Sequence, residues 1–305
     1  MYDLDWEKNG ESASRIVLGC MRINGLELKE AELLLKTAID AGINFFDHAD
    51  IYGDGECERI FAQALKLGSD ERDKLFIQSK CGIREGMFDF SAEHILSSVD
   101  GILQRLETDY LDFLLLHRPD TLVEPEEVAE AFDILSASGK VRQFGVSNQN
   151  PAQIELLQAY LSQRLQINQL QFGIMHTGMI DQGINVNMKN EGGVDRDGSI
   201  LDYCRLNDII IQAWSPYQYG FFDGVFLGNE KFPELNQVLD EIAGEHGISA
   251  TALATAWILR HPAGMQVILG STNKERVADI APAGETEISR EEWYRIYRAA
   301  GNTLP

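Results

Sequence analysis

Eight short runs rich in apolar and β-branched residues alternate with longer segments whose apolar residues recur at helical spacing. A chain that repeats strand and helix builds a parallel sheet, because each helix returns the chain to the edge where the next strand begins. Eight such repeats predict an α/β fold, a closed (β/α)8 TIM barrel. The expected strands are residues 15–19, 43–47, 75–80, 111–117, 141–147, 166–171, 209–214 and 266–269.

An open, doubly wound sheet is the alternative arrangement of the same elements. Its dinucleotide-binding version carries a Gly-x-Gly-x-x-Gly motif directly after the first strand. No such motif follows residues 15–19, so the barrel is preferred. Because a barrel of about this length is usually one domain, we expect residues 1–305 to form a single domain.

The connection after the sixth expected strand departs from the repeat. Between residues 171 and 199 the chain is rich in Gly and Asn, and it is long for a barrel loop. It leaves the C-terminal end of its strand, which is the active-site end in barrels. We expect it to form a lid or a pocket wall, and a surface excursion without a role is the alternative.

The amino-acid composition excludes some classes of binding partner. The formal net charge of -22 argues against nucleic acid and anionic membranes, because both need a basic protein face. The first residues are acidic and polar, unlike a signal peptide, and no apolar run reaches the length of a membrane span. The four cysteines form neither a Cys-x-x-Cys pair nor a compact disulfide framework. We therefore expect a cytoplasmic protein with reduced thiols.

Polar side chains stand at the ends of three consecutive expected strands. Asp47, Lys80 and His117 each close an apolar run, and Tyr52 lies in the loop that follows Asp47. Taken singly, each has an ordinary explanation as a helix cap, a solvated strand end, a core histidine or a packing aromatic. The C-terminal ends of barrel strands share one rim, however, so the four side chains are expected to converge there.

These residue types suit the chemistry of a carbonyl group. The ordinary pKa of tyrosine, about 10, is too high for an efficient general acid at neutral pH. A nearby ammonium such as Lys80 would lower the pKa of Tyr52, and Asp47 would hold Lys80 in place. His117 would donate a hydrogen bond to a substrate oxygen. The hydride itself has to come from a cofactor.

The stretch FFDHADIYG, residues 45–53, also places a histidine beside an aspartate and so raises the question of a metal site. Neighbouring residues of a strand point to opposite faces. Asp47 and His48 should therefore not share one ion. We expect no metal here, and we expect His48 to make a structural contact behind the rim.

Several separate motifs resemble those of the aldo-keto reductase family. INFFDHADIYGDGECE is similar to the family segment that holds an Asp and a Tyr, SKCG to its lysine segment, and DFLLLHRPD to its histidine segment. GKVRQFGVSN resembles its fifth-strand motif and NKERV its C-terminal cofactor motif. These motifs occur in the same order as in the family, and the resemblance extends from residue 15 to the end of the chain. DHADIYG, AWSPY, AWILRHP and EEWYRIYRAAG are similar to a bacterial branch of YdhF-type oxidoreductases.

The resemblance implies an enzyme that reduces an aldehyde or ketone to an alcohol with a nicotinamide dinucleotide. Tyr52 would be the general acid, Lys80 would tune it, Asp47 would hold Lys80, and His117 would orient the carbonyl. A cofactor-binding redox sensor or regulatory protein on the same fold is the alternative, and a barrel isomerase or lyase without nicotinamide is another. A monomer or a small homo-oligomer is expected.

The same resemblance assigns cofactor contacts. Arg276 would reach a 2'-phosphate or stack on the adenine, and Lys274 adds positive charge nearby, which favours NADP(H). The stretch LGSTN supplies hydroxyls but no further charge, so NAD(H) stays open. Tyr217 is an alternative to Trp214 for stacking on the nicotinamide. The implied cofactor residues are Ser147, Asn148, Gln169, Trp214, Ser215, Gly270, Ser271, Thr272, Asn273 and Arg276.

The resemblance implies a small carbonyl substrate, and its pocket is expected to include Met21, Arg22, Ile83 and Arg118. The two arginines suggest an anionic substrate. The alternative is that both pair with local acids, for example Arg118 with Asp120.

Overall fold

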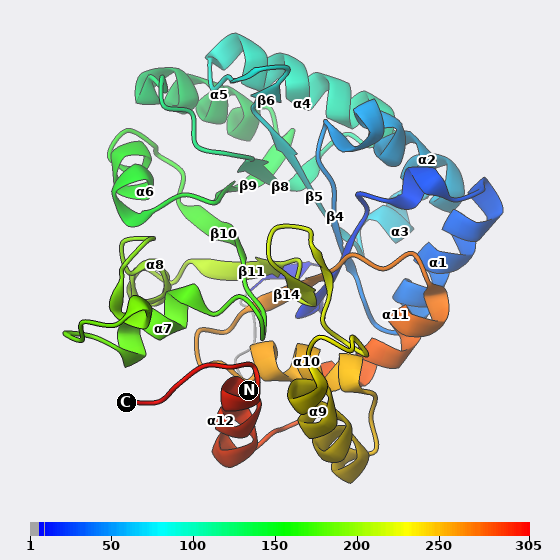
Figure 1. The fold of residues 1–305 in the computed structure, drawn as a ribbon. Coiled ribbons are helices and arrows are strands. Elements are labelled where there is room, and N and C mark those ends of the chain that lie inside the picture. Colours follow the sequence, from blue (N-terminus) through cyan, green and yellow to red (C-terminus); the bar gives the residue numbers. More distant parts are fainter. Residues whose placement is uncertain (1–5, 9) are drawn as a thin grey trace.

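The computed structural model describes residues 6–8 and 10–305, and eight parallel strands form its centre (Figure 1). Each strand pairs with the next, and the last pairs with the first through Val267, Ile268 and Leu269. This closure confirms the predicted barrel and excludes the open sheet. In order around the barrel the strands are β3 (Ile16–Gly19), β4 (Phe45–Asp47), β5 (Phe76–Cys81), β8 (Leu111–Leu116), β9 (Val141–Ser147), β10 (Leu165–Gln171), β11 (Ile210–Trp214) and β14 (Gln266–Leu269).

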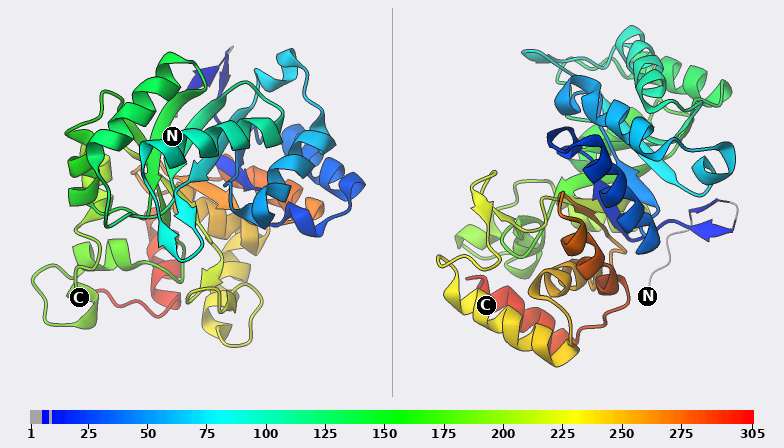
Figure 2. Two further views of the ribbon diagram at one scale, coloured as in Figure 1. Left: turned by 90° about the horizontal axis from the view of Figure 1, so that it is seen from above. Right: turned by 90° about the vertical axis from the view of Figure 1, so that its right-hand side faces the viewer.

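Helices surround the barrel on its outer side (Figures 1 and 2), and α9 and α12 lie side by side. Three helices begin directly after a serine N-cap. Ser91, Ser249 and Ser289 each accept a hydrogen bond from a main-chain N–H of the first helical turn. The helices are α1 (Leu28–Asp40), α2 (Glu56–Leu65), α3 (Ser69–Arg72), α4 (Ala92–Leu106), α5 (Pro125–Ala137), α6 (Pro151–Gln158), α7 (Gly178–Ile184), α8 (Ile200–Leu206), α9 (Pro233–His246), α10 (Ala250–Leu259), α11 (Lys274–Ile280) and α12 (Arg290–Ala299).

Short strands and 3-10 turns lie outside the eight barrel strands. Three two-stranded antiparallel ribbons and four 3-10 turns complete the described part of the chain. The ribbons are β1 (Glu7–Lys8) with β2 (Glu11–Ser12), β6 (Ile83–Arg84) with β7 (Met87–Phe88), and β12 (Gln218–Tyr219) with β13 (Gly224–Val225). The turns are η1 (Ile23–Gly25), η2 (Tyr52–Gly55), η3 (Glu191–Gly193) and η4 (Ala281–Gly284).

An aromatic cluster fills the N-terminal end of the barrel. The Trp6 ring lies 4.6 Å from Phe113, and Phe45 stacks on Phe76 at 5.8 Å and on Phe113 at 5.4 Å. Aromatic side chains bury a large apolar area. These rings pack together at the N-terminal end of the barrel, opposite the C-terminal rim.

The long connection after β10 is more ordered than its composition suggests. It contains α7 and η3, and Asp195 accepts main-chain hydrogen bonds from residues 197, 198 and 199.

All four cysteines are buried and unpaired. Within residues 6–8 and 10–305, no helix is long and apolar enough to cross a bilayer.

Candidate active site

Three strand ends and one turn bring the four candidate catalytic residues to the C-terminal rim. Asp47 ends β4, Lys80 lies near the end of β5, and His117 follows β8. Tyr52 begins η2, where Gly53, Asp54 and Gly55 all have φ between 54° and 83°. Left-handed backbone favours glycine, and two of these three positions hold it. The tight turn keeps Tyr52 close to the rim.

Lys80 is the centre of the arrangement. Its Nζ donates to Asp47 Oδ2 at 2.8 Å, to the main-chain carbonyl of His48 at 2.7 Å, and to the Tyr52 hydroxyl oxygen at 3.2 Å. These three bonds use all three ammonium hydrogens. The Tyr52 oxygen is therefore an acceptor toward Lys80, and its own hydrogen remains for another partner. The His117 ring stands edge-on to the Tyr52 ring at 5.9 Å.

The surroundings set the protonation states. Burial acts to lower the pKa of Lys80, but the charge of Asp47 and the contact with Tyr52 outweigh it, so the pKa of Lys80 is raised. Burial also raises the pKa of Tyr52, and Lys80 opposes that rise without cancelling it. We predicted a lowered pKa for Tyr52; the effect of Lys80 has the expected sign, but burial is larger. Tyr52 is therefore protonated at neutral pH.

His117 is held neutral. Burial, then the nearby cations Lys80 and Arg118, place the pKa of His117 well below its ordinary value. A neutral imidazole carries one N–H donor and no charge. His117 can therefore hydrogen-bond to a carbonyl oxygen without itself titrating near neutral pH.

His48 faces away from the rim, as the strand alternation predicts. It is fully buried and meets the ring of Phe61 edge-on at 4.7 Å. Burial, then the charge of Lys80, lower the pKa of His48 to about 3. Across the described residues, no group of three or more His, Cys, Asp or Glu side chains is placed to hold a metal ion.

A cavity of about 690 Å³ opens above these residues. Lys80 is fully buried beneath it, where it supports Tyr52 rather than lining the space. Thr272 and Asn273 are also outside the lining, and Asn273 instead caps α11 by accepting from the N–H of Arg276 at 2.7 Å. The predicted residues that do line the cavity are Asp47, Tyr52, His117, Ser147, Asn148, Gln169, Trp214, Ser215, Gly270, Ser271, Arg276, Met21, Arg22, Ile83 and Arg118.

One side of the cavity is a linked set of polar groups. Ser147 Oγ donates to the carbonyl of Gln169 at 3.0 Å, Asn148 Nδ2 donates to Ser147 Oγ at 2.7 Å, and Trp214 Nε1 donates to Asn148 Oδ1 at 3.2 Å. Asn148 and Ser215 hold left-handed φ values of 56° and 50°. Non-glycine residues in that region are uncommon and gather at functional sites. The hydrogen bonds fix the Trp214 ring and the amide of Asn148 at the cavity surface.

The cavity wall comes from a segment that the sequence analysis did not select. The β12–β13 ribbon and its flanks line the cavity, and Phe222 stacks with Trp214 at 6.2 Å. Among the described lining residues, none lies between positions 172 and 199. The prediction that the 171–199 connection forms a pocket wall is therefore wrong, and its alternative role as a lid stays a prediction. The stretch YGFFDG, two aromatics between glycines, was the available signal for the true wall.

Arg118 does not pair with Asp120. The two carboxylate oxygens of Asp120 accept main-chain hydrogen bonds from Phe90 and Leu122. Arg118 is half-buried, its guanidinium lies 5.8 Å from the ring centroid of Trp214, and no carboxylate in the described part of the chain forms an ion pair with it. Arg22 is exposed and lines the same cavity. The cavity lining thus includes cationic groups in a strongly acidic protein.

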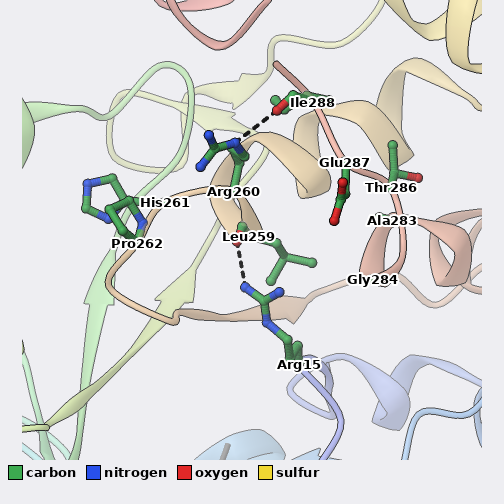
Figure 3. A pocket seen from close by; sticks show the side chains of 10 residues that line it. All are labelled: Arg15, Leu259, Arg260, His261, Pro262, Ala283, Gly284, Thr286, Glu287 and Ile288. Atoms are coloured by element: carbon green, nitrogen blue, oxygen red, sulfur yellow. Dashed lines mark hydrogen bonds between the residues drawn. The ribbon is translucent and has the colours of Figure 1, made fainter. Parts of the chain in front are cut away.

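A second hollow, of about 320 Å³, lies near the other end of the barrel between α10 and η4 (Figure 3). Arg15 Nη2 donates to the carbonyl of Leu259 at 2.6 Å, and Arg260 Nε donates to the carbonyl of Ile288 at 2.9 Å. Both guanidinium groups therefore tie main-chain segments together. None of the four candidate catalytic residues lines this hollow, so the cavity lined by Asp47, Tyr52 and His117 is the candidate site.

Curated relatives match nearly the whole chain. The uncharacterized oxidoreductase YcsN of Bacillus subtilis is 37% identical, with 96% of each chain covered. The 6-dehydroglucose reductase of Agrobacterium fabrum is 36% identical, with 94% of each covered, and the oxidoreductase YdhF of Escherichia coli is 35% identical, with 95% of each covered.

Solved structures share the barrel. An aldo-keto reductase from Klebsiella pneumoniae in complex with NADPH superimposes with a TM-score of 0.77 at 24% identity, covering 98% of this chain and 95% of that one. The sequence model of the aldo/keto reductase family matches residues 15–300. With the barrel, the rim geometry and relatives above 30% identity in agreement, this chain belongs to the aldo/keto reductase family.

Proposed function

We propose that this protein reduces an aldehyde or ketone to an alcohol with NADP(H), using Tyr52 as the general acid. One observation carries the proposal: Lys80 donates simultaneously to Asp47 and to the Tyr52 hydroxyl oxygen, beneath a cavity large enough for a ligand. Because Tyr52 accepts from Lys80, its hydroxyl hydrogen is free to point toward the cavity. A proton donor aimed at a substrate oxygen is the requirement of carbonyl reduction.

Each residue then has a distinct role. Tyr52 donates its proton to the carbonyl oxygen as that oxygen gains negative charge. The Lys80 ammonium stabilises the phenolate that remains, and Asp47 keeps the ammonium in position. Neutral His117 donates a hydrogen bond to the same oxygen and fixes the direction of the carbonyl. In oxidation of an alcohol, the Tyr52 phenolate would act as the base.

The chain's residues fit a nicotinamide dinucleotide. Asn148 and Gln169 present amide groups at the cavity, and Trp214 offers a flat ring held by a hydrogen bond. Arg276 also lines the cavity, and its exposed guanidinium can meet a phosphate. The bound cofactor supplies the hydride. The relative from Klebsiella pneumoniae in complex with NADPH supports this choice of nucleotide.

Replacing Tyr52 with Phe is expected to lower carbonyl reduction by roughly two to four orders of magnitude, because the proton donor is removed and the ring is kept. The rate is measured as NADPH oxidation at 340 nm over a panel of aldehydes and diketones. Cofactor binding, followed by tryptophan fluorescence, should be unchanged. Near-normal turnover in Tyr52→Phe would refute the role of Tyr52, and tight NADPH binding without turnover of any panel member by the wild type would favour the sensor alternative.

Replacing Arg276 with Ala is expected to weaken NADPH binding about tenfold and NADH binding much less, because only NADPH carries the 2'-phosphate. Dissociation constants for both nucleotides are measured by fluorescence titration. Arg290→Ala removes the same charge from an exposed position on α12 and serves as the control. Equal losses for the two nucleotides would place Arg276 on the adenine or away from the site.

Replacing Arg22 and Arg118 together with Met tests the preference for an anionic substrate. A half-buried guanidinium without a carboxylate partner attracts an anion, so kcat/KM for 2-carboxybenzaldehyde should fall about tenfold relative to benzaldehyde. Both substrates are compared in one assay, so a general loss of activity cancels in the ratio. An unchanged ratio would show that neither arginine selects the substrate.

A further inference from the structure

Below the rim, four glutamine side chains form a polar layer inside the barrel. Gln78 on β5, Gln212 on β11 and Gln266 on β14 are fully buried, and Gln169 on β10 is 4% exposed. The strand register places Asp47 beside Gln78, and places Gln212 beside both Gln169 and Gln266. The interior of such a barrel is usually filled with branched apolar side chains. Four buried amides therefore need hydrogen-bond partners to be tolerated.

The layer is anchored to the main chain at one end. Gln266 Nε2 donates to the carbonyl of Ser14 at 2.8 Å. The Oε1 of Gln266 therefore faces inward, and it accepts from Gln212 Nε2 at 2.9 Å. This bond in turn orients the amide of Gln212, because its nitrogen end is committed to Gln266 and its oxygen end has to face the other way.

The other end of the layer meets Asp47. Gln212 Oε1 accepts from Gln78 Nε2 at 2.9 Å and from Gln169 Nε2 at 3.0 Å. The same two nitrogens donate to Asp47 Oδ1 at 2.5 Å and 3.1 Å. Gln212 thus holds the nitrogen ends of two amides toward the carboxylate. Without that acceptor, either amide is free to turn its oxygen toward Asp47, which repels a carboxylate.

We propose that Gln212 is a positioning residue for the reduction: through Gln78 and Gln169 it fixes the Asp47 carboxylate, which holds Lys80 against Tyr52. This rests on the proposed function. Gln212 lies outside the cavity lining, so it acts only through the groups it contacts, and Gln78 and Gln169 both lead to Asp47. Because Gln169 also lines the cavity, the dissociation constant of NADPH separates this route from one through the cofactor. A glutamine that merely fills the core would show no such dependence.

A double-mutant cycle between Gln212→Met and Asp47→Asn separates the two cases. Met has a similar volume but removes the acceptor. In the wild-type background, Gln212→Met is expected to lower kcat about tenfold while the dissociation constant of NADPH stays the same. In the Asp47→Asn background it should cause little further loss. Equal losses in both backgrounds, or no loss in either, would overturn the proposal.

A second readout does not require activity. The ring resonances of 13C-labelled tyrosine report the environment of Tyr52 at neutral pH, and Tyr52→Phe identifies its signal. Gln212→Met should shift this signal in the wild type but not in Asp47→Asn. If no carbonyl is reduced yet the shift depends on Asp47, the reductase function fails and the positioning role stands. If reduction occurs but the shift is the same in both backgrounds, the positioning role fails alone.

Two further variants keep the test decisive. Gln182→Met removes another buried glutamine, one that donates to Asp197 at 2.7 Å, and it should leave kcat and the Tyr52 signal unchanged. If Gln212→Met does not fold, Gln78→Met removes one direct donor to Asp47 and is expected to show the same dependence on Asp47. A cycle with Gln78→Met in which the two effects simply add would overturn the proposal.

Discussion

The three hydrogen bonds of the Lys80 ammonium are the constraint on which the rest of the site depends. They join β5 to β4 through Asp47 and to the turn that carries Tyr52. A fully buried ammonium is costly unless a carboxylate compensates its charge and acceptors satisfy its hydrogens. The same bonds that make Lys80 tolerable also determine where the Tyr52 hydroxyl hydrogen can point. The same three hydrogen bonds therefore stabilise the buried Lys80 and orient the Tyr52 hydroxyl for proton donation.

The charged side chains that line the cavity are mostly cationic, although the protein as a whole is strongly acidic. A net charge of -22 repels an anionic nucleotide at a distance, so the cavity has to supply its own cations. Arg22, Arg118 and Arg276 lie along its lining, while the negative Asp47 is neutralised beneath the surface by Lys80. His117 stays uncharged beside them. The cavity is thus locally favourable to phosphate and to a polarised carbonyl oxygen.

The sequence predicted the barrel and the convergence of four polar side chains at one rim, because both follow from rules of position. Apolar runs give the strands to within two residues, and residues that end parallel strands share a rim. The stretch YGFFDG signals an aromatic loop, but not that it forms the cavity wall, because a loop's direction depends on what it packs against. In the sequence, the glutamines of the layer are separate polar residues within different strands, such as Gln212 within IIIQAW. The layer could not be predicted, because the hydrogen-bond partners of each glutamine lie on other strands. The net pKa shift of Tyr52 required knowing its burial.

The most direct test of the central claim is the pH dependence of kcat/KM for NADPH-dependent reduction, compared between the wild type and Lys80→Met. Tyr52 has a raised pKa and His117 a lowered one, so the wild-type rate should stay level through neutral pH and fall only in the alkaline range, as Tyr52 loses its proton. Lys80→Met should be slow throughout, because the phenolate loses its counter-ion. A wild-type rate that falls with an apparent pKa near 6.5, and does so equally in Lys80→Met, would show that an imidazole is the acid and contradict the account.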